Sequence, residues 1–282
     1  MPEFPRTLVG GVSLPRMIIG SNWLLGYSHT SSAADGYINQ INRNEESIAA
    51  IFEAFLEYGI DAVMAPMVAN PVLLGGAKLA EDRTGKGLIL IDTPILNVDD
   101  SAEGRKEAEK VIVDSAKAGC RFCFPHHSSA EQLVNKNRHE IQRLPDYLSM
   151  IREQGMIPGL SAHMPELILY SDEQGYDVET YIQIYNCLGF LMQVELEAVH
   201  KIIWNAKKPV MSIKPMAAGR VSPFVGLSFS FSTLREKDMV TVGCMTPAEA
   251  YEDIEIGLAA IERRPPGIQG RSSPNKTAIL RA

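Results

Sequence analysis

Short, continuous apolar runs alternate with segments of helical periodicity along most of the chain. The first run covers residues 16–20, and the segment after it places apolar side chains at i, i+3, i+4, i+7 and i+8 positions between residues 48 and 56. Asn44 stands where a helix N-cap is expected, and Gly59 stands where that helix would end. The pattern therefore predicts an amphipathic helix that follows a buried strand.

The same alternation continues to the last third of the chain. The expected strands cover residues 16–20, 61–66, 88–92, 121–124, 157–160, 181–185, 210–213 and 239–242. Helices are expected between them, including residues 103–118 and a last helix over 248–263 that starts at Thr246-Pro247. Apolar strands separated by helices indicate a parallel sheet that is covered on its outer faces. Eight such units predict an α/β fold, a closed (β/α)8 barrel.

The two ends of the chain lie outside this alternation. Residues 7–14 read as a small hairpin with a Gly-Gly turn. The tail from residue 264 is rich in proline and serine, so we expect it to be irregular. No low-complexity linker interrupts the pattern, and residues 1–282 are therefore predicted to form one barrel domain.

Composition and charge narrow the partners. A net charge of −7 argues against nucleic acid, because phosphate binding needs a basic face. The chain has no basic run for an anionic membrane and no apolar run long enough to span a bilayer. Its start lacks the charged and apolar regions of a signal peptide. We therefore predict a cytoplasmic protein whose partner is a small molecule.

Cys120 and Cys123 have the spacing of a redox pair or of metal ligands. Residues 121–124 read as a strand, however, and alternation along it would put the two thiols on opposite faces. Free cysteine is also a common core residue. We therefore expect the four cysteines to be buried, reduced thiols.

Several segments, in order, resemble aldo-keto reductases. They are Gly20-Ser21-Asn22-Trp23, residues 59–65, Gly159-Leu160-Ser161, residues 183–186, residues 213–219, and Val242-Gly243 followed by residues 246–249. The resemblance covers about residues 7–263 and implies a reductase-like barrel. It also implies reduction of carbonyl compounds with NADPH by a tyrosine that is assisted by aspartate, lysine and histidine.

Most of that catalytic set is missing from this sequence. In the register of the resemblance, the aspartate falls on Met64, the tyrosine near Ala69 and the lysine on Pro94. The histidine alone is kept, as His126 or His127. Because methionine, alanine and proline cannot donate a proton, ordinary reduction is not expected, although Tyr27 offers a replacement acid.

The nucleotide signal is also weak. The resemblance implies that the loops after the seventh and eighth strands hold NADPH, often with a basic residue at its 2′-phosphate. Residues 243–247 contain no lysine or arginine for this contact. Arg220 could face a phosphate, or it could be an ordinary solvated loop residue.

Polar residues gather instead at the expected carboxyl ends of the strands, where barrels of this type do their chemistry. The candidates are Asn22, Trp23, His29, Asp92, His126, His127, His163, Glu166, Asn186 and Lys214. His126, His127, Asp92 and Lys214 are the candidate catalytic residues. Asn22, Trp23, His29 and Asn186 are the candidate substrate contacts. His139 and His200 are expected on helix surfaces, and Asp61 has a structural place at the opposite end of the barrel.

Three interpretations of this cluster stay open. A transition metal could be bound by His163 together with His126 or His127 and a carboxylate from Glu166 or Asp92, since imidazole and carboxylate are suitable ligands. Histidine could instead shuttle protons without a metal, with Lys214 and Asp92 orienting a substrate. The histidines could also be structural, bonded to backbone.

Three functions follow from these interpretations. The first is an enzyme acting on a small polar metabolite, a sugar-like or hydroxylated carbonyl compound, at a site centred on histidine. The second is an NADPH-dependent oxidoreductase with a different proton donor. The third is a non-catalytic relative of the reductases.

Overall fold

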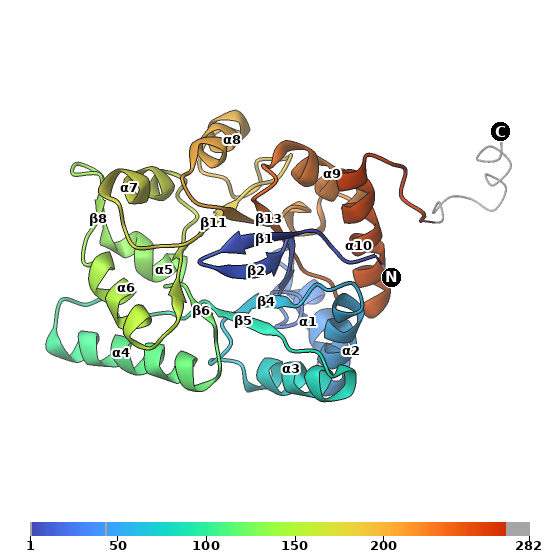
Figure 1. Cartoon of the computed structure of the whole chain (residues 1–282), viewed down its shortest axis with the longest axis horizontal. Coiled ribbons are helices and arrows are strands. Elements are labelled where there is room, and N and C mark those ends of the chain that lie inside the picture. The colour runs from blue at the N-terminus through green and yellow to red at the C-terminus, as the bar shows by residue number, and fades with distance from the viewer. Residues whose placement is uncertain (1, 43, 269–282) are drawn as a thin grey trace, which may run out of the picture.

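The computed structural model describes residues 2–42 and 44–268, and in it eight parallel strand positions enclose a central barrel (Figure 1). The barrel strands are β3 (Met17–Gly20), β4 (Ala62–Ala65), β5 (Ile89–Asp92), β6 (Phe122–Cys123), β9 (Ile157–Pro158) with β10 (Leu160–Ser161), β11 (Tyr181–Ile184), β12 (Val210–Ile213) and β13 (Met239–Val242). Their order in the sheet is β10-β11-β12-β13-β3-β4-β5-β6-β9. The two ends of that order are consecutive in sequence, so the fifth strand position closes the barrel.

Gly159 joins β9 to β10 and allows this fifth strand position to close the barrel. A Cβ atom at this position would lie 2.5 Å from the ring of Phe124, which is fully buried inside the barrel. Only glycine lets the fifth strand pass this close to that ring. The pairing of β9 with β6 and of β10 with β11 therefore depends on having glycine, which has no side chain, at position 159.

Helices cover the outside of the barrel (Figure 1). They are α1 (Ser32–Ile41), α2 (Glu45–Leu56), α3 (Pro71–Thr84), α4 (Ala102–Lys117), α5 (His127–Ala130), α6 (Leu144–Glu153), α7 (Glu166–Gln174), α8 (Leu196–Asn205), α9 (Pro223–Thr233) and α10 (Pro247–Glu262). Two 3-10 turns, η1 (Glu131–Leu133) and η2 (Ala217–Gly219), and a small hairpin of β7 (Val134–Asn135) and β8 (Glu140–Ile141) lie in the loops. The (β/α)8 prediction is confirmed.

The predicted helix starts are confirmed in detail. The side chain of Asn44 caps α2 by accepting a hydrogen bond from the backbone N–H of Ser47. The side chain of Thr246 caps α10 by accepting one from Glu249, with Pro247 in the first turn. Each cap satisfies a backbone donor that the helix itself leaves without a partner.

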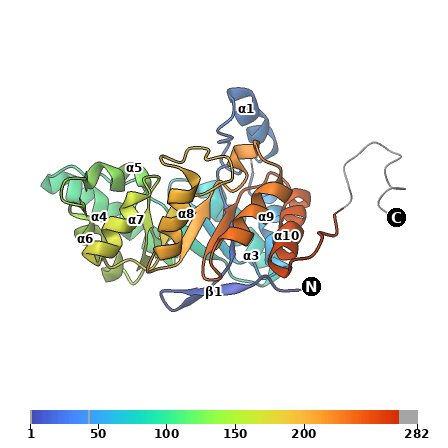
Figure 2. The same cartoon turned by 90° about the horizontal axis from the view of Figure 1, so that it is seen from above.

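The predicted hairpin is β1 (Arg6–Val9) paired with β2 (Val12–Pro15), and it lies across one end of the barrel (Figure 1). Gly10 and Gly11 form its turn with φ of 54° and 80°, values that favour glycine. Val9 and Leu14 belong to the buried cluster inside the barrel. The hairpin therefore seals the amino-terminal end of the strands, on the side opposite α1 (Figure 2).

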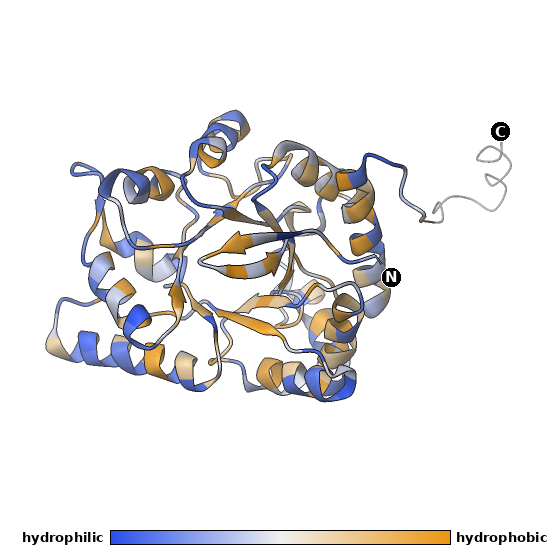
Figure 3. Cartoon of the chain, in the orientation of Figure 1, coloured by the Kyte–Doolittle hydropathy of each residue, from blue (hydrophilic) through white to orange (hydrophobic). Residues whose placement is uncertain are grey.

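The apolar core has two layers. The barrel strands are mostly hydrophobic, whereas the surrounding helices mix hydrophobic and hydrophilic residues (Figure 3). The inner layer fills the barrel with side chains such as Ile18, Ile91 and Phe122. The outer layer lies between strands and helices and contains the stripe of α2. Because side chains alternate along each strand, neighbouring residues point into opposite layers. Only those that point into the barrel can reach a site at its mouth.

Three smaller expectations have different outcomes. The cysteines are free, and three of them are buried, but Cys187 is only half-buried. Cys120 and Cys123 both pack in the outer layer rather than on opposite faces, because β6 begins only at Phe122. Asp61 binds Arg6 of the hairpin at 3.0 Å, in the structural place expected for it. The tail has no helix or strand as far as residue 268, and the rest of it lies outside the described residues.

None of the helices within residues 2–42 and 44–268 combines the length and the apolar character that crossing a membrane requires.

Candidate active site

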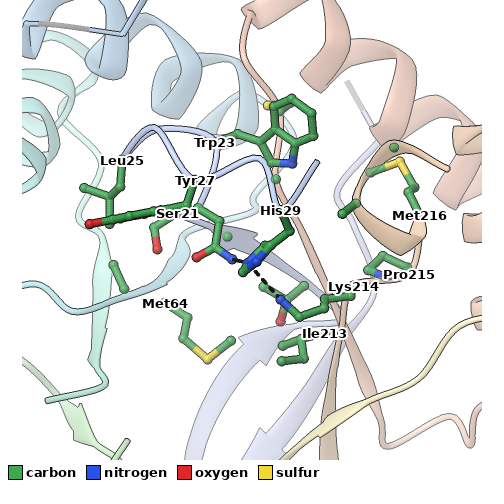
Figure 4. A pocket seen from close by; sticks show the side chains of 18 of the residues that line it. Ser21, Trp23, Leu25, Tyr27, His29, Met64, Ile213, Lys214, Pro215 and Met216 are labelled. Carbon is green, nitrogen blue, oxygen red and sulfur yellow. Dashed lines mark hydrogen bonds between the residues drawn. The ribbon is translucent and has the colours of Figure 1, made fainter. Parts of the chain in front are cut away.

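A cavity of about 810 Å³ opens at the carboxyl ends of the barrel strands, on the side opposite the hairpin. Its inner wall includes Met64, Ser161, Ile182, Ile213 and Thr241, which come from five different strands. Side chains from the first strand's loop stand over this wall, as Figure 4 shows for Trp23, Tyr27 and His29. Barrel enzymes keep their catalytic residues at this end, so the cavity is the candidate active site.

Three histidine rings line one side of the cavity. The rings of His126 and His127 have centroids 4.2 Å apart, and those of His127 and His163 lie 3.6 Å apart with planes inclined by only 18°. His126 and His127 follow β6, and His163 follows β10. The neighbouring fourth and fifth strand positions thus bring together residues that are 36 apart in the sequence.

His126 is held by the start of α5. It is the N-cap residue of that short helix, and its Nδ1 accepts a hydrogen bond from the backbone N–H of Ser128 at 3.3 Å. The Oγ atom of Ser128 lies 2.8 Å from the same nitrogen. A nitrogen that accepts from a backbone N–H carries no proton, so neutral His126 is protonated at Nε2.

Burial shifts the titration of two of these rings. It lowers the pKa of His126 to about 4, with a further contribution from His127. It lowers the pKa of His163 to about 4 as well, and His127 and Lys214 add to this shift. Both rings are therefore neutral at pH 7 and can donate or accept a hydrogen bond without a fixed charge.

The two lowered pKa values predict an acid-sensitive fold. Between about pH 6.5 and pH 4, unfolded histidines take up protons that folded His126 and His163 do not, so the free energy of unfolding falls as pH falls. Since both rings are partly exposed, we expect about 1–2 kcal/mol from each rather than the full value of the shifts.

Urea unfolding at pH 7, 6, 5 and 4 measures this loss. The paired variant His126→Asn/His163→Asn should lose less stability over the same range, because it lacks the two shifted groups. Equal losses in the two proteins would show that these rings titrate normally when folded.

A second polar group, which includes His29 and Lys214, lies at the cavity mouth (Figure 4). The Nζ atom of Lys214 lies 3.1 Å from Nε2 of His29, and Nδ2 of Asn22 lies 2.9 Å from the same nitrogen. Burial lowers the pKa of Lys214, and burial together with Lys214 lowers that of His29. A neutral His29 can therefore accept a hydrogen bond from the lysine ammonium group.

The backbone at this second group is strained. His29 has φ of 56° and Lys214 has φ of 60°, in the left-handed region that side chains with a Cβ rarely adopt. Such residues persist where the surrounding structure holds them, and they are concentrated at functional sites. The meeting of two strained residues through their side chains supports a functional role for this mouth.

Two of the predicted site residues point away from the cavity. Asp92 is fully buried outside the barrel, where its carboxylate accepts hydrogen bonds from Ser115 Oγ at 2.5 Å and from the backbone N–H of Met67 at 2.7 Å. Asn186 is also fully buried and organises its own loop by accepting from the N–H of Phe190 and donating to its carbonyl. The catalytic prediction for Asp92 and the substrate-contact prediction for Asn186 are therefore corrected to structural roles.

The proposed metal ligands do not converge. Glu166 binds Lys136 at 2.7 Å instead of joining His126 and His163. Across residues 2–42 and 44–268, no group of three or more histidine, cysteine, aspartate and glutamate side chains is arranged to hold a metal ion. The donor set therefore gives no support to a metal-assisted site.

NADPH, which the resemblance implies, also fits poorly. Among the described residues that line the cavity, Lys214 is the single lysine or arginine. At the start of α10, Glu249 reaches back to accept a hydrogen bond from Met245 N–H at 2.7 Å. This carboxylate puts a negative charge at the amino-terminal end of α10, where a helix would otherwise favour an anion such as a phosphate. We therefore assign no step to a nucleotide.

Arg220 has another use than a phosphate contact. Its guanidinium group lies 4.1 Å above the ring of Phe190, and its Nη2 donates to the backbone carbonyl of His29 at 3.3 Å. The arginine thus ties the loop after β12 to the loop that carries His29. The weak prediction of a cofactor contact finds no support.

The other two histidines differ in part from the prediction. His139 is exposed, as expected, but lies in the turn between β7 and β8 rather than on a helix. His200 lies on α8, but it is half-buried with Nδ1 at 2.9 Å from the hydroxyl of Tyr185. Neither lines the cavity.

Glu131 lies beside the histidines and was not among the predicted site residues. This residue follows α5, and one of its carboxylate oxygens accepts hydrogen bonds from the backbone N–H groups of His163 at 2.6 Å and Met164 at 3.0 Å. The other oxygen lies 3.7 Å from Nδ1 of His127. Burial would raise the pKa of Glu131, but these contacts outweigh it and lower the pKa, so the group is a carboxylate. Its place four residues after His127 was the available signal.

Comparison with known proteins identifies the fold. No family model matches the sequence, and no curated protein matches it either. A Pseudomonas aeruginosa protein assigned to the aldo-keto reductases has a similar structure, with 14% identity, a TM-score of 0.63, and coverage of 91% of this chain and 96% of that chain.

Two further structures give the same result. An aldo-keto reductase from Klebsiella pneumoniae, solved with NADPH, has 14% identity and a TM-score of 0.59 over 97% of this chain and 99% of its own. Aldose reductase from Giardia lamblia has 12% identity and a TM-score of 0.55 over 95% and 91%. Likeness at this level concerns the fold and not the reaction. The chain therefore has the barrel fold of the aldo-keto reductases.

Proposed function

We propose that this chain is an enzyme that moves a proton next to the carbonyl group of a small hydroxylated compound, using histidine and no metal ion. The observation that carries the proposal is the wall of His126, His127 and His163 at the mouth of the barrel, with two of the rings neutral at pH 7. Neutral imidazole can accept a proton from carbon and can polarise a carbonyl oxygen.

Lys214 supports the same chemistry. Its Nζ atom is held by His29, and it lies close enough to His163 to lower that ring's pKa. Proton removal next to a carbonyl places negative charge on oxygen. A lysine that is fixed before the reaction begins stabilises that charge, and it also suits a hydroxylated or carboxylated substrate.

Loss of a proton from carbon is the direct measure of this activity. The protein should be incubated in D2O with hydroxyacetone, dihydroxyacetone, glyceraldehyde and erythrulose, and the α-proton signals followed by NMR. We expect exchange that survives treatment with a chelator and disappears in the double variant His126→Ala/His127→Ala. Exchange that is lost with the chelator and restored by a metal would favour the metal-assisted reading. No exchange with any of these compounds would count against the proposal.

An NADPH-dependent oxidoreductase is the second candidate. It is favoured by the extent of the cavity, which continues from the histidines past the ends of β12 and β13 to Met216, Gly243 and Met245. It is disfavoured by the carboxylate of Glu249 at the start of α10.

Titration of nicotinamide fluorescence separates the two candidates. Because Glu249 places a carboxylate at the start of α10, where it repels an anion, we expect no saturable NADPH binding at millimolar concentration. The variant Glu249→Gln removes the charge and tests whether that carboxylate is the obstacle. Saturable binding at micromolar NADPH to the unaltered protein would make the oxidoreductase the better proposal.

A further inference from the structure

Glu131 is anchored next to the histidine wall. It is not among the residues that line the cavity, and its side chain is 20% exposed. Two backbone N–H groups hold one carboxylate oxygen, at 2.6 and 3.0 Å. The carboxylate is thus ionised and fixed in place, and its second oxygen is left 3.7 Å from His127 Nδ1.

The Nδ1 atoms of His126 and His127 face different kinds of partner: a hydrogen-bond donor at His126 and an acceptor at His127. At His126, Nδ1 accepts from the N–H of Ser128, so the proton of the neutral ring is on Nε2. At His127, Nδ1 is fully buried and has no partner at hydrogen-bond distance, and the carboxylate of Glu131 lies just beyond that distance. A carboxylate can only accept, so this contact favours a proton on Nδ1 of His127.

Both histidines line the cavity. Whether Nδ1 carries the proton therefore decides whether the Nε2 atom of each ring donates a hydrogen bond to a ligand or accepts one. His126 presents Nε2–H, which donates. His127 presents an unprotonated Nε2, which accepts. Hydrogen bonds to a catalytic base are often long without substrate and shorten in the complex, which suits the 3.7 Å separation.

We propose that Glu131 is a positioning residue that makes His127 the proton acceptor of the site, while Ser128 makes His126 the hydrogen-bond donor. The chemical consequence rests on the proposed function. The C–H bond next to the carbonyl breaks, its proton goes to Nε2 of His127, and its electron pair moves onto the carbonyl oxygen, which accepts from Nε2–H of His126. Glu131 balances the imidazolium that forms. The proton returns to carbon or exchanges with water.

The tautomers can be measured without any substrate. Two-bond proton–nitrogen correlation spectra of the ¹⁵N-histidine-labelled full chain at pH 7.5 distinguish the two nitrogens of each ring, and single replacements assign the six histidines. We expect His126 to be protonated at Nε2 and His127 at Nδ1. His127 protonated at Nε2 in the unaltered protein would overturn the proposal, whatever any variant does.

The variant Glu131→Gln tests the cause. The amide keeps the size of the side chain and an oxygen for the backbone donors but removes the charge that faces His127. We expect His127 to lose its preference for Nδ1–H while His126 keeps its tautomer. Glu166→Gln is the matched control, since Glu166 binds Lys136, and it should leave both tautomers unchanged. An unchanged His127 in Glu131→Gln would overturn the role of Glu131.

Kinetics connect the tautomers to the reaction. With a compound that exchanges, Glu131→Gln should lower kcat about 10²-fold or more with little change in KM, because a base in the wrong tautomer still leaves the binding site intact. Glu131→Asp should recover part of the rate. Equal rates in Glu131→Gln and the unaltered protein would overturn the positioning role. The expected tautomers without exchange in any compound would instead overturn the proposed function and leave the tautomer assignment standing.

Discussion

Replacing His127 with alanine is expected to lower the rate of α-proton exchange by about 10²–10⁴-fold, the usual contribution of a positioned general base. The ring sits between those of His126 and His163, and its buried Nδ1 faces the fixed carboxylate of Glu131. Its removal takes away the proton acceptor while Lys214 and the rest of the mouth remain. The loss should therefore appear in kcat more than in KM.

His139→Ala is the matched control for this experiment. His139 is an exposed histidine in the turn between β7 and β8, and it does not line the cavity. Its removal should leave the exchange rate unchanged. Thermal unfolding of both variants separates a loss of catalysis from a loss of fold.

A different result would move the chemistry to Lys214. If His127→Ala keeps its rate and Lys214→Ala loses it, the lysine is the reacting group, since burial lowers its pKa and favours attack on a carbonyl. Reduction with borohydride in the presence of substrate, followed by mass spectrometry, would then reveal a covalent adduct on Lys214.

The periodicity of the sequence was enough to predict the barrel. Each strand is a continuous apolar run because both of its faces are buried, and each long helix carries an apolar stripe between recognisable ends such as Asn44 and Thr246. The elements that were missed are short and lie in the loops, where few side chains are buried. In α1, for example, Ile38 is the one buried residue.

Only part of the candidate site could be predicted from the sequence. His126, His127, His163 and Lys214 line the cavity because the carboxyl ends of barrel strands meet at one mouth. The direction in which each side chain points was harder to predict, because it depends on the residue at which a strand begins and ends. Glu131 lies four residues after His127, but that spacing alone did not single it out, because its other partners are backbone N–H groups of a loop that follows another strand.

Asp92 shows how one position along a strand separates a catalytic from a structural residue. Its neighbour Ile91 points into the barrel, so alternation turns Asp92 outward, toward α4. The carboxylate is fully buried and accepts hydrogen bonds from the Ser115 hydroxyl and from the backbone N–H of Met67. Burial raises the pKa of Asp92, and these hydrogen bonds oppose that rise.

Asp92→Ala should therefore cost stability and not catalysis. Because it leaves buried donors without a partner, we expect the free energy of unfolding to fall by about 2–4 kcal/mol, measured by urea unfolding. Ser115→Ala, which removes only the hydroxyl donor, should cost less. The exchange rate per folded molecule should be unchanged in both variants, since neither residue lines the cavity. A loss of rate with unchanged stability would return Asp92 to the reaction, and a movement of this carboxylate into the mouth would then have to be part of the catalytic cycle.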